Sequence, residues 1–475
     1  MRDRKLFIGS GIRRLRETKG LTQVDFASKL RISTAYLSQM ETNQRPVSAA
    51  VLYGLTTAFG IELNELVSED PDRLGADLKE ALSDPVFPDR GISNVDIQTL
   101  ATSAPWLAQR FLDLHSAYRR VLEEADGIAE MGGRPGASDR AKDVARRLPF
   151  EEVRDFFLYN NNYFDALDRA GEDFATRLDT EPHNLANALG TYCGKKLGLR
   201  LRLLDVSDGR YRSYDSDAKV LAIHPALLIS ERTFQMLCQI GWIEHGTAIR
   251  QMVAAAKFKS REAEAIAESA LVNYFAAAVM LPYRRFAKAA LETRHDLHFL
   301  ARMFSASLEQ VCHRLATLQR ASHKGVPVYF LKVDRAGTIV KRHNANRFQF
   351  PRFGGACPLW NVYQAFEQPD RILVQKAEMP DGTDFLCLAT SVTKASHQPG
   401  TVVQRHALGM GCELNDARHF IYADEIDHPG REAIPIGVSC RVCPRHACAH
   451  RAVPPTNAQI SVNPNERAIA PYAIT

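Results

Sequence analysis

The first 70 residues carry apolar side chains at helical spacing, interrupted by residues that start and stop helices. Gly20 ends the first predicted helix, and Thr22 and Ser33 are typical N-caps of a second and a third. Two short helices joined by a three-residue turn form a helix-turn-helix. The pattern therefore predicts a bundle of five short helices over residues 1–70.

Positive charge is concentrated in the same part of the chain. Residues 1–45 contain ten Lys or Arg and four Asp or Glu, a net charge of +6, whereas the whole chain of 475 residues carries +5. A basic module on a nearly neutral body is typical of a protein that meets a phosphate backbone through one domain. A solvated run of charge is the plainer alternative.

The N-terminal motifs Leu21-Thr22-Gln23, Tyr36-Leu37-Ser38-Gln39-Met40-Glu41 and Arg45-Pro46 resemble the Cro/phage-repressor type of helix-turn-helix. The resemblance implies that Gln23, Asn43 and Arg45 contact phosphates of double-stranded operator DNA. It also implies that the exposed face of the recognition helix reads base edges through Thr34, Ala35, Ser38 and Gln39.

Residues 71–148 are predicted to be helical and to link the DNA-binding module to the remainder. Apolar residues recur at three and four positions along one long helix, at Phe111, Leu114, Tyr118, Val121 and Ala125. Such a stripe fits a partner helix, from the same chain or from a second subunit. Because helix-turn-helix proteins usually read two half-sites, we expect a homodimer or a tetramer.

Residues 149–322 are expected to mix helices with strands around 199–204 and 220–223. They resemble the IrrE/ImmA metallopeptidase-like domain in two stretches, 232–242 and 273–282. A zinc peptidase of this type needs two imidazoles one helical turn apart, a carboxylate base and a third ligand. The matching positions here hold Cys238, Gln239, Trp242 and Leu271. Proteolysis is therefore not expected, and a former active-site cleft lined by Trp242 is predicted to serve as a ligand pocket.

The segment 155–164 is dense in aromatic and amide side chains, and basic residues follow it. Aromatic faces and amides can hold a nucleotide base or a thioester, and cations can meet phosphates. Taken singly, each aromatic residue is more often part of a core. The candidate ligand residues are Phe157, Tyr159, Asn162, Tyr163, Arg169, Lys195, Lys196 and Trp242.

Residues 323–475 read as strand-rich, with strands expected over 326–333, 371–378, 384–390 and 401–407, and end in a cysteine cluster. Cys440, Cys443 and Cys448 are spaced to share one inorganic centre, and Cys357 and Cys412 are the candidates for a fourth thiolate. A [4Fe-4S] cluster and a zinc ion, the latter also with His446 or His450, both suit this set. Reduced buried cysteines without a metal are the third alternative.

Taken together with the phrase Phe350-Pro351-Arg352-Phe353-Gly354-Gly355-Ala356-Cys357-Pro358-Leu359-Trp360, these features resemble the short-chain fatty acyl-CoA regulators, which include propionate and glyoxylate regulators. The resemblance covers nearly the whole chain. It implies a short acyl-CoA effector such as propionyl-CoA and an iron-sulfur cluster in the C-terminal part.

The sequence thus predicts a multidomain, mainly α protein with α+β parts. Its expected domains are a helix-turn-helix bundle (1–70), a helical linker (71–148), a zincin-like α+β domain (149–322) and a strand-rich, cysteine-rich domain (323–475). With no run of about 20 apolar residues for a bilayer, we expect a cytoplasmic transcription factor without catalysis or membrane contact. The alternatives are a DNA-targeted zinc metallopeptidase and an antitoxin-like interaction protein.

Overall fold

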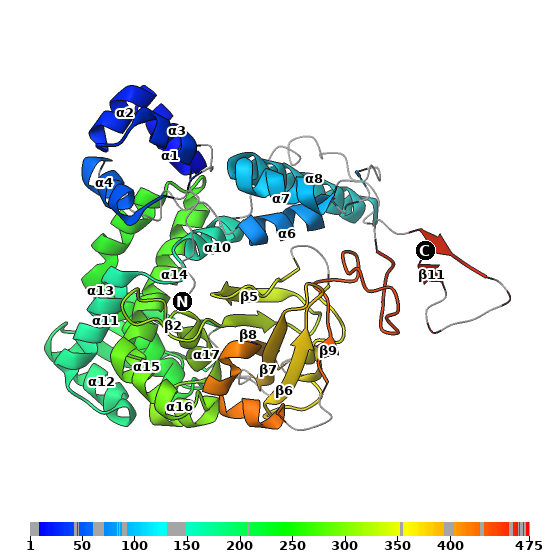
Figure 1. Cartoon of the computed structure of the whole chain (residues 1–475). Coiled ribbons are helices and arrows are strands. Elements are labelled where there is room, and N and C mark those ends of the chain that lie inside the picture. Colours follow the sequence, from blue (N-terminus) through cyan, green and yellow to red (C-terminus); the bar gives the residue numbers. More distant parts are fainter. Residues whose placement is uncertain are drawn as a thin grey trace. The chain divides into compact units, whose positions relative to one another are not determined.

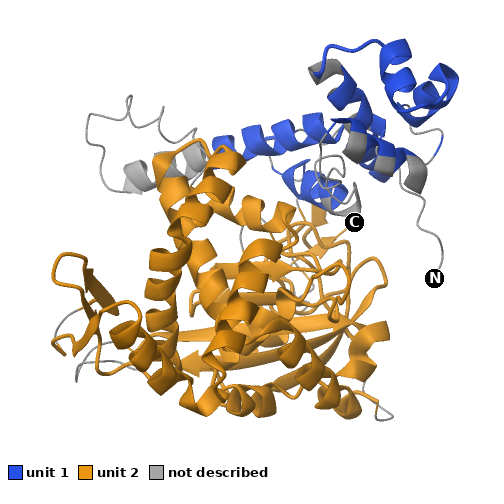
Figure 2. Cartoon of the chain, turned by 90° about the vertical axis from the view of Figure 1, so that its left-hand side faces the viewer, with its two compact units in different colours: residues 1–147 blue, residues 148–475 orange. Residues whose placement is uncertain are grey.

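The computed structural model divides the chain into two compact units, residues 1–147 and residues 148–475 (Figure 2). It describes residues 9–41, 45, 47–59, 71–82, 84, 86–87, 93–130, 149–206, 209–351, 355–393, 403–427, 432–455, 459–463, 465, 469 and 472–474. The predicted fold class is confirmed: helices dominate, and the large sheet is formed by strands of the C-terminal part (Figure 1).

Four helices form the N-terminal bundle: α1 (Gly9–Thr18), α2 (Gln23–Lys29), α3 (Thr34–Glu41) and α4 (Ala49–Phe59). Gly20 has φ +65°, the conformation that ends α1. The Thr22 side chain accepts a hydrogen bond from the Asp25 N–H, and the Ser33 hydroxyl accepts one from the Tyr36 N–H. Both predicted N-caps are therefore present. The fifth predicted helix lies outside the described residues.

Three further helices complete the first unit: α6 (Pro71–Leu82), α7 (Asn94–Ser103) and α8 (Pro105–Glu130). Their core is small and contains Leu74, Leu78 and Leu112. Of the predicted apolar stripe, Phe111 is half-buried against the Phe87 ring, whereas Leu114 is 69% exposed. The Val121 and Ala125 side chains lie outside the described part.

The second unit begins with helices. In chain order they are α10 (Pro149–Tyr159), α11 (Asp165–Leu178), η1 (Pro182–Asn184), α12 (Leu185–Lys195), α13 (Ile229–Ala256), α14 (Arg261–Met280), α15 (Tyr283–Glu292), α16 (Leu297–Met303) and α17 (Leu308–Ala316). No single described helix is long and apolar enough to cross a membrane. Only α14 and α15 together, bent by 61°, reach that length and composition, and both are core helices of this unit.

A small sheet of three strands interrupts these helices between α12 and α13. Its strands are β1 (Arg200–Leu203), β2 (Arg212–Asp215) and β3 (Val220–Ile223), in the order β1-β3-β2. β3 pairs in parallel with β1 and antiparallel with β2.

A six-stranded sheet follows in the order β5-β4-β8-β7-β6-β9. The strands are β4 (Tyr329–Val333), β5 (Ile339–Asn344), β6 (Leu373–Glu378), β7 (Asp384–Thr393), β8 (Arg405–Glu413) and β9 (Ile434–Pro435), with α18 (Asn361–Gln364) between β5 and β6. All neighbours are antiparallel except β6 and β9. The remaining elements are η2 (Leu414–His419), η3 (Ile421–Glu425) and the antiparallel pair β10 (Ile460–Ser461) and β11 (Ala473–Ile474).

The two faces of the large sheet belong to different cores. Phe330, Leu386 and Cys412 pack with α10–α17, whereas Cys357 and Cys387 belong to a second cluster around Trp360. Because the first core combines helices from residues 149–322 with strands from residues 323–475, these two predicted domains form one compact unit. The structure divides the chain between residues 147 and 148, close to the predicted boundary at 148.

A buried charge network joins the helices of this unit. The Asp168 carboxylate accepts hydrogen bonds from Arg314, Arg320 and the Tyr274 hydroxyl. Arg320 also donates to Glu172, and all of these side chains come from α11, α14 and the region at and after α17. Every charge in the group has an opposite partner, as burial requires.

Candidate functional site

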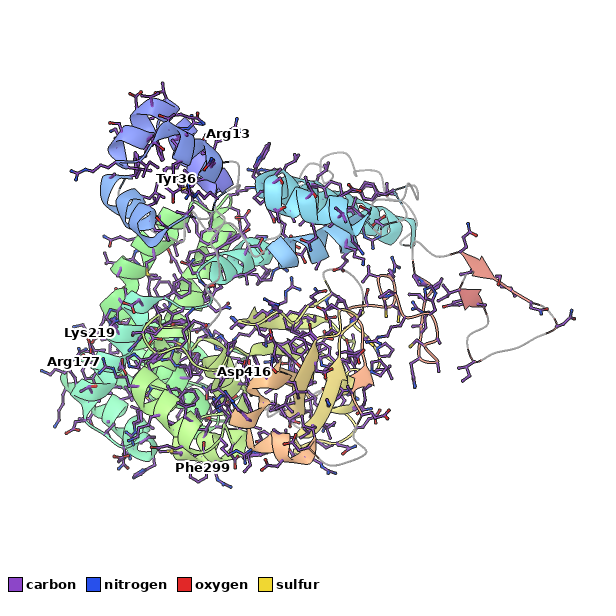
Figure 3. The ribbon with its side chains drawn as sticks, viewed as in Figure 1. Arg13, Tyr36, Arg177, Lys219, Phe299 and Asp416 are labelled. Carbon is purple, nitrogen blue, oxygen red and sulfur yellow. The ribbon has the colours of Figure 1, made fainter. Side chains whose placement is uncertain are left out.

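The recognition helix α3 presents its predicted base-reading face to the outside of the bundle. Thr34, Ala35 and Gln39 are exposed, and Ser38 is half-buried. Figure 3 labels Tyr36 of the same helix and Arg13 of α1. The four predicted base-reading residues therefore share a helix whose opposite face packs through Leu37 and Met40.

Gln23 has a role inside the bundle. Its amide Nε2 donates to Oε2 of Glu41 at 2.8 Å, and Arg16 Nε donates to Oε1 of Glu41 at 2.6 Å. The Gln23 side chain thus helps to hold α1, α2 and α3 together around one buried carboxylate, in addition to its predicted contact with DNA.

Arg45 is exposed, and its guanidinium lies 4.8 Å from the centroid of the Tyr36 ring. A cation over an aromatic face is held in place while its N–H groups stay available. This arrangement suits the predicted phosphate contact. Asn43 lies outside the described residues.

The positions that match the metal site of the peptidases hold side chains that pack against their neighbours. Cys238, Gln239 and Leu271 are buried, and the Cys238 thiol donates to Asn273 Oδ1 at 3.2 Å. A Cβ built on Gly241 would lie 2.8 Å from the Phe275 ring, so this ring occupies the space between α13 and α14. Burial raises the pKa of the Cys238 thiol to about 12, which leaves a poor metal ligand.

The described side chains at the positions that match the peptidase metal site are thus packed together. Trp242 is half-buried and packs against the hydrophobic core. A cavity of about 670 Å³ lies instead beyond Asn273, between α10, α14, α17 and β5. Its walls are formed by Phe150, Glu151, Val153, Arg154, Phe157, Ile266, Ala270, Asn273, His313, residues 336–343, Pro351 and Gly355.

Two histidines form the most buried polar part of this cavity wall. The rings of His313 and His343 lie 4.4 Å apart, and His343 Nδ1 lies 2.9 Å from Asn162 Oδ1. The Asn162 amide in turn donates to the backbone carbonyl of Asn344. Burial, reinforced by the charge of Lys341, holds the pKa of both imidazoles well below the usual range, so both are neutral at pH 7.

Among the predicted ligand residues, Phe157 lines the cavity and Asn162 supports it from behind through His343. Tyr163 accepts a hydrogen bond from Arg320 and donates to Asp165, and Arg169 forms an exposed ion pair with the same Asp165. The others also lie outside the cavity wall: Tyr159 is exposed, as are Lys195 and Lys196 where α12 ends. The predicted set therefore does not form one site.

The sequence prediction missed Arg154, His313, Lys341 and His343. Arg154 lies on α10, one residue before the segment 155–164 that the prediction used, so its helical spacing from Phe157 could have suggested it. His313 and His343 come from two distant elements, and only the pairing of β5 with β4 next to α17 brings them together.

Four cysteines converge in the C-terminal part. Cys357, Cys440, Cys443 and Cys448 all line one small cavity, and its wall includes Gly437, where a Cβ would lie 2.9 Å from the Cys443 sulfur. Burial raises the pKa of the Cys357 thiol, and the neighbouring Cys440 and Cys443 add to this shift. Cys412 lies in β8 on the other face of the large sheet. Of the two candidates for a fourth ligand, the fold therefore brings Cys357 to the other three.

Arginines organise the cysteine segment. Arg451 donates to the backbone carbonyls of Cys440 and Cys443, at 2.7 and 3.1 Å, and Arg445 pairs with Glu378. In both arginines Nε is buried without a hydrogen-bond partner among the described residues. The Nε–H groups of two arginines in this cavity wall therefore have no acceptor among the described residues.

Three family models match successive parts of the chain. Residues 12–66 match a helix-turn-helix, residues 195–316 the IrrE N-terminal-like domain, and residues 317–472 the C-terminal region of the short-chain fatty acyl coenzyme A regulators. A propionyl-CoA carboxylase regulator from Cereibacter sphaeroides is 44% identical over 470 residues, which cover 99% of each chain. The chain belongs to the short-chain fatty acyl-CoA regulator family.

Other members of this family support the same assignment. The transcriptional regulators RamB and PrpR of Mycobacterium tuberculosis are each 36% identical to this chain, and each match covers 99% of this chain. The matches cover 99% of RamB and 96% of PrpR. The solved structure of a Mycobacterium tuberculosis transcriptional regulator matches 69% of this chain and 100% of that chain, with a TM-score of 0.65 and 38% identity. The chain is thus a helix-turn-helix transcriptional regulator.

Proposed function

We propose that this regulator binds operator DNA through α3 and responds to a short-chain acyl-CoA, such as propionyl-CoA, in the cavity between α10, α14, α17 and β5. The observation that carries the proposal is this cavity of about 670 Å³, in a family named for acyl-CoA regulation. Its volume lies in the range of pockets that hold small-molecule cofactors.

The chemistry of the walls fits the parts of a CoA thioester. Val153, Phe157 and Ile266 offer an apolar surface to a short acyl chain. Arg154, Lys341 and Arg342 provide cations for phosphates near the half-buried rim. A CoA thioester carries both an apolar acyl chain and a charged nucleotide, so its binding site needs both apolar and cationic side chains.

The response is proposed to be a population shift. If acyl-CoA prefers one arrangement of the two units, it changes the placement of the two recognition helices in a dimer, and with it the affinity for half-sites about one helical turn apart. One relative is named as a regulator of propionyl-CoA carboxylase. The operators of genes that consume propionyl-CoA are therefore the first DNA sequences to test. Regulation without catalysis fits the absence of the peptidase residues at 238, 239, 242 and 271.

The test combines calorimetry with mobility shift of DNA from the gene's own upstream region. Propionyl-CoA should bind, and should change DNA retardation, whereas propionate should do neither. Ala270→Phe fills the cavity from α14 and should abolish the response, whereas Ala265→Phe, at an exposed position of the same helix, should keep it. Retardation that no acyl-CoA alters would refute the effector proposal and leave DNA binding intact.

A [4Fe-4S] cluster held by Cys357, Cys440, Cys443 and Cys448 is the second part of the proposal. The four thiols, and the unpartnered Nε donors of Arg445 and Arg451, are suitable neighbours for an anionic sulfur centre. When bound, such a cluster would tie the C-terminal segment to the loop before α18 and could change its charge with redox state.

Zinc is the rival occupant. Four thiolates on one zinc ion, each about 2.3 Å from it, lie about 4 Å from one another, whereas each thiolate of a cluster binds its own iron and the set spreads wider. Among the described residues, no three His, Cys, Asp or Glu side chains are grouped closely enough for a metal ion. The small cavity that the four cysteines line has a volume of only about 10 Å³, room for about one water molecule, so a cluster requires the turn-rich segment 439–451 to sit farther out.

A further inference from the structure

Asn273 is a polar residue in an otherwise buried part of α14. Within residues 271–280 it alone is exposed, and its neighbours Val272 and Tyr274 are at most 2% exposed. Asn273 lines the cavity between α10, α14, α17 and β5. It therefore brings a side-chain amide to the wall of this cavity.

The Cys238 thiol determines which end of this amide faces the cavity. Cys238 Sγ donates to Asn273 Oδ1 at 3.2 Å, and burial, which raises the pKa of the thiol to about 12, keeps the S–H protonated at pH 7. The amide nitrogen lies on the other side of the planar group, and it has no hydrogen-bond partner among the described residues. Asn273 thus presents two N–H donors to the cavity.

A second polar side chain, His313, lies on the same wall. Asp168 Oδ2 accepts hydrogen bonds from the Tyr274 hydroxyl and from Arg314 Nη1, both at 2.7 Å. These two donors directly follow Asn273 and His313 in the chain, so their shared partner holds the two cavity-lining residues close to the same level of α14 and α17. Nε2 of His313 is buried and has no hydrogen-bond partner in the described part of the chain. This part of the wall therefore suits an uncharged polar group of a ligand.

We propose that Asn273 donates a hydrogen bond to the thioester carbonyl of the acyl-CoA, and that Cys238 is the positioning residue that orients the Asn273 amide for this contact. The inference rests on the proposed acyl-CoA function and adds how the acyl thioester is recognised. A thioester carbonyl is an uncharged acceptor with an apolar chain beside it, which fits an amide donor on a wall that also contains Val153 and Phe157. The position that matches a metal ligand in the peptidases would then serve ligand recognition.

Asn273→Asp tests the carbonyl contact. Wild type should bind propionyl-CoA at least tenfold more tightly than S-propyl-CoA, the thioether without a carbonyl, because the analogue leaves the amide donor without a partner. Asn273→Asp keeps the size of the side chain and the acceptor for Cys238 but removes both N–H donors, so it should bind the two ligands alike in calorimetry. Ser269→Ala, at an exposed position of α14 outside the cavity wall, should keep the wild-type preference.

Three variants test the positioning role of Cys238. Cys238→Ala should reduce the preference for propionyl-CoA at least threefold, whereas Cys238→Ser, which keeps a donor, should retain most of it. In the Asn273→Asp background, Cys238→Ala should not change the preference further. Cys193→Ala removes another buried thiol of the same core, one that does not line the cavity, and should leave the preference as in wild type.

The outcomes separate this inference from the proposed function. If wild type binds both ligands alike, or if Asn273→Asp keeps the wild-type preference, the carbonyl contact is wrong while the acyl-CoA function stands. If Cys238→Ala keeps the preference, the positioning role is wrong. If wild type binds no acyl-CoA, or if Ala270→Phe binds as wild type does, the function itself fails and this inference with it.

Discussion

Asp168 and Arg314 form a fully buried ion pair, in which Arg314 Nη1 donates to Asp168 Oδ2 at 2.7 Å and both side chains are at most 1% exposed. The pair joins α11 to α17, and a second guanidinium, from Arg320, donates to the other carboxylate oxygen at 2.9 Å. His313, which lines the proposed ligand cavity, precedes Arg314 on the same helix. The ion pair therefore fixes the helix that carries the cavity wall.

Removing the shared carboxylate should weaken the second unit strongly. Asp168→Ala leaves two guanidinium groups buried without their counter-charge, so we expect the free energy of unfolding to fall by about 3–5 kcal/mol. Urea unfolding followed by far-UV circular dichroism measures this. Arg169→Ala, which breaks an ion pair on the surface of α11, should have little effect. A similar loss in both variants would contradict the assignment.

Buried histidines predict how stability depends on pH. The pKa values of His313 and His343 are held well below the usual range in the folded chain, mainly by burial, whereas in the unfolded chain they stay near 6.5. Below pH 6.5 the unfolded chain therefore takes up protons that the folded chain does not, and stability falls by up to about 1.4 kcal/mol per pH unit for each histidine.

The expected result is a shallower decline between pH 7 and pH 5 for His343→Phe than for wild type. Unfolding free energies at several pH values provide the measurement. His298→Ala, at an exposed position of α16, should retain the wild-type slope. A His343→Phe slope as steep as that of wild type would show that this imidazole does not resist protonation.

The helix-turn-helix predicts two different mutational effects on DNA binding. Arg45→Ala should weaken binding to every sequence and reduce the slope of log K against log salt by about 1, because it removes a predicted phosphate contact. Gln39→Ala should instead cost about 1–3 kcal/mol on preferred sites only. Mobility shifts at several salt concentrations separate the two, and identical behaviour would refute the division of roles.

The cysteine site predicts a contrast between two buried thiols. Cys443→Ser should remove the visible absorbance, iron and sulfide of anaerobically purified protein, whereas Cys412→Ser, on the other face of the sheet, should retain them. Metal analysis and absorption spectra provide the measurement. Zinc without colour in the wild type would identify the rival occupant, and colour lost only in Cys412→Ser would contradict the site.

Local patterns predicted much of the fold. The caps at Thr22 and Ser33 placed α2 and α3, and the strand predicted at 220–223 coincides with β3. The run predicted at 401–407 is less accurate, since β8 begins at Arg405 and extends to Glu413. β2 and β5 were not predicted, because their polar residues, as in Ile339–Asn344, hide the strand pattern.

The candidate site was harder to predict than the fold. Residues of one helix, such as Phe157, follow from periodicity, but the cavity joins α10, α14, α17 and β5, and the distance between them in the chain hides their proximity. The prediction of a pocket at Trp242 assumed that the loss of the metal ligands leaves an empty cleft. The choice between Cys357 and Cys412 depended on which face of the sheet each occupies, and no local pattern contains that information.

The close approach of Phe275 to Gly241 limits which residue α13 can carry at position 241. A Cβ at position 241 would lie 2.8 Å from the Phe275 ring, so even alanine there would displace the ring or push α13 and α14 apart. Cutting that ring back would open a hole at the centre of the largest core in the molecule, at a cost of about 3–5 kcal/mol for a buried phenylalanine. The two helices are thus matched to each other at this point, and a larger residue on one of them requires a compensating change on the other.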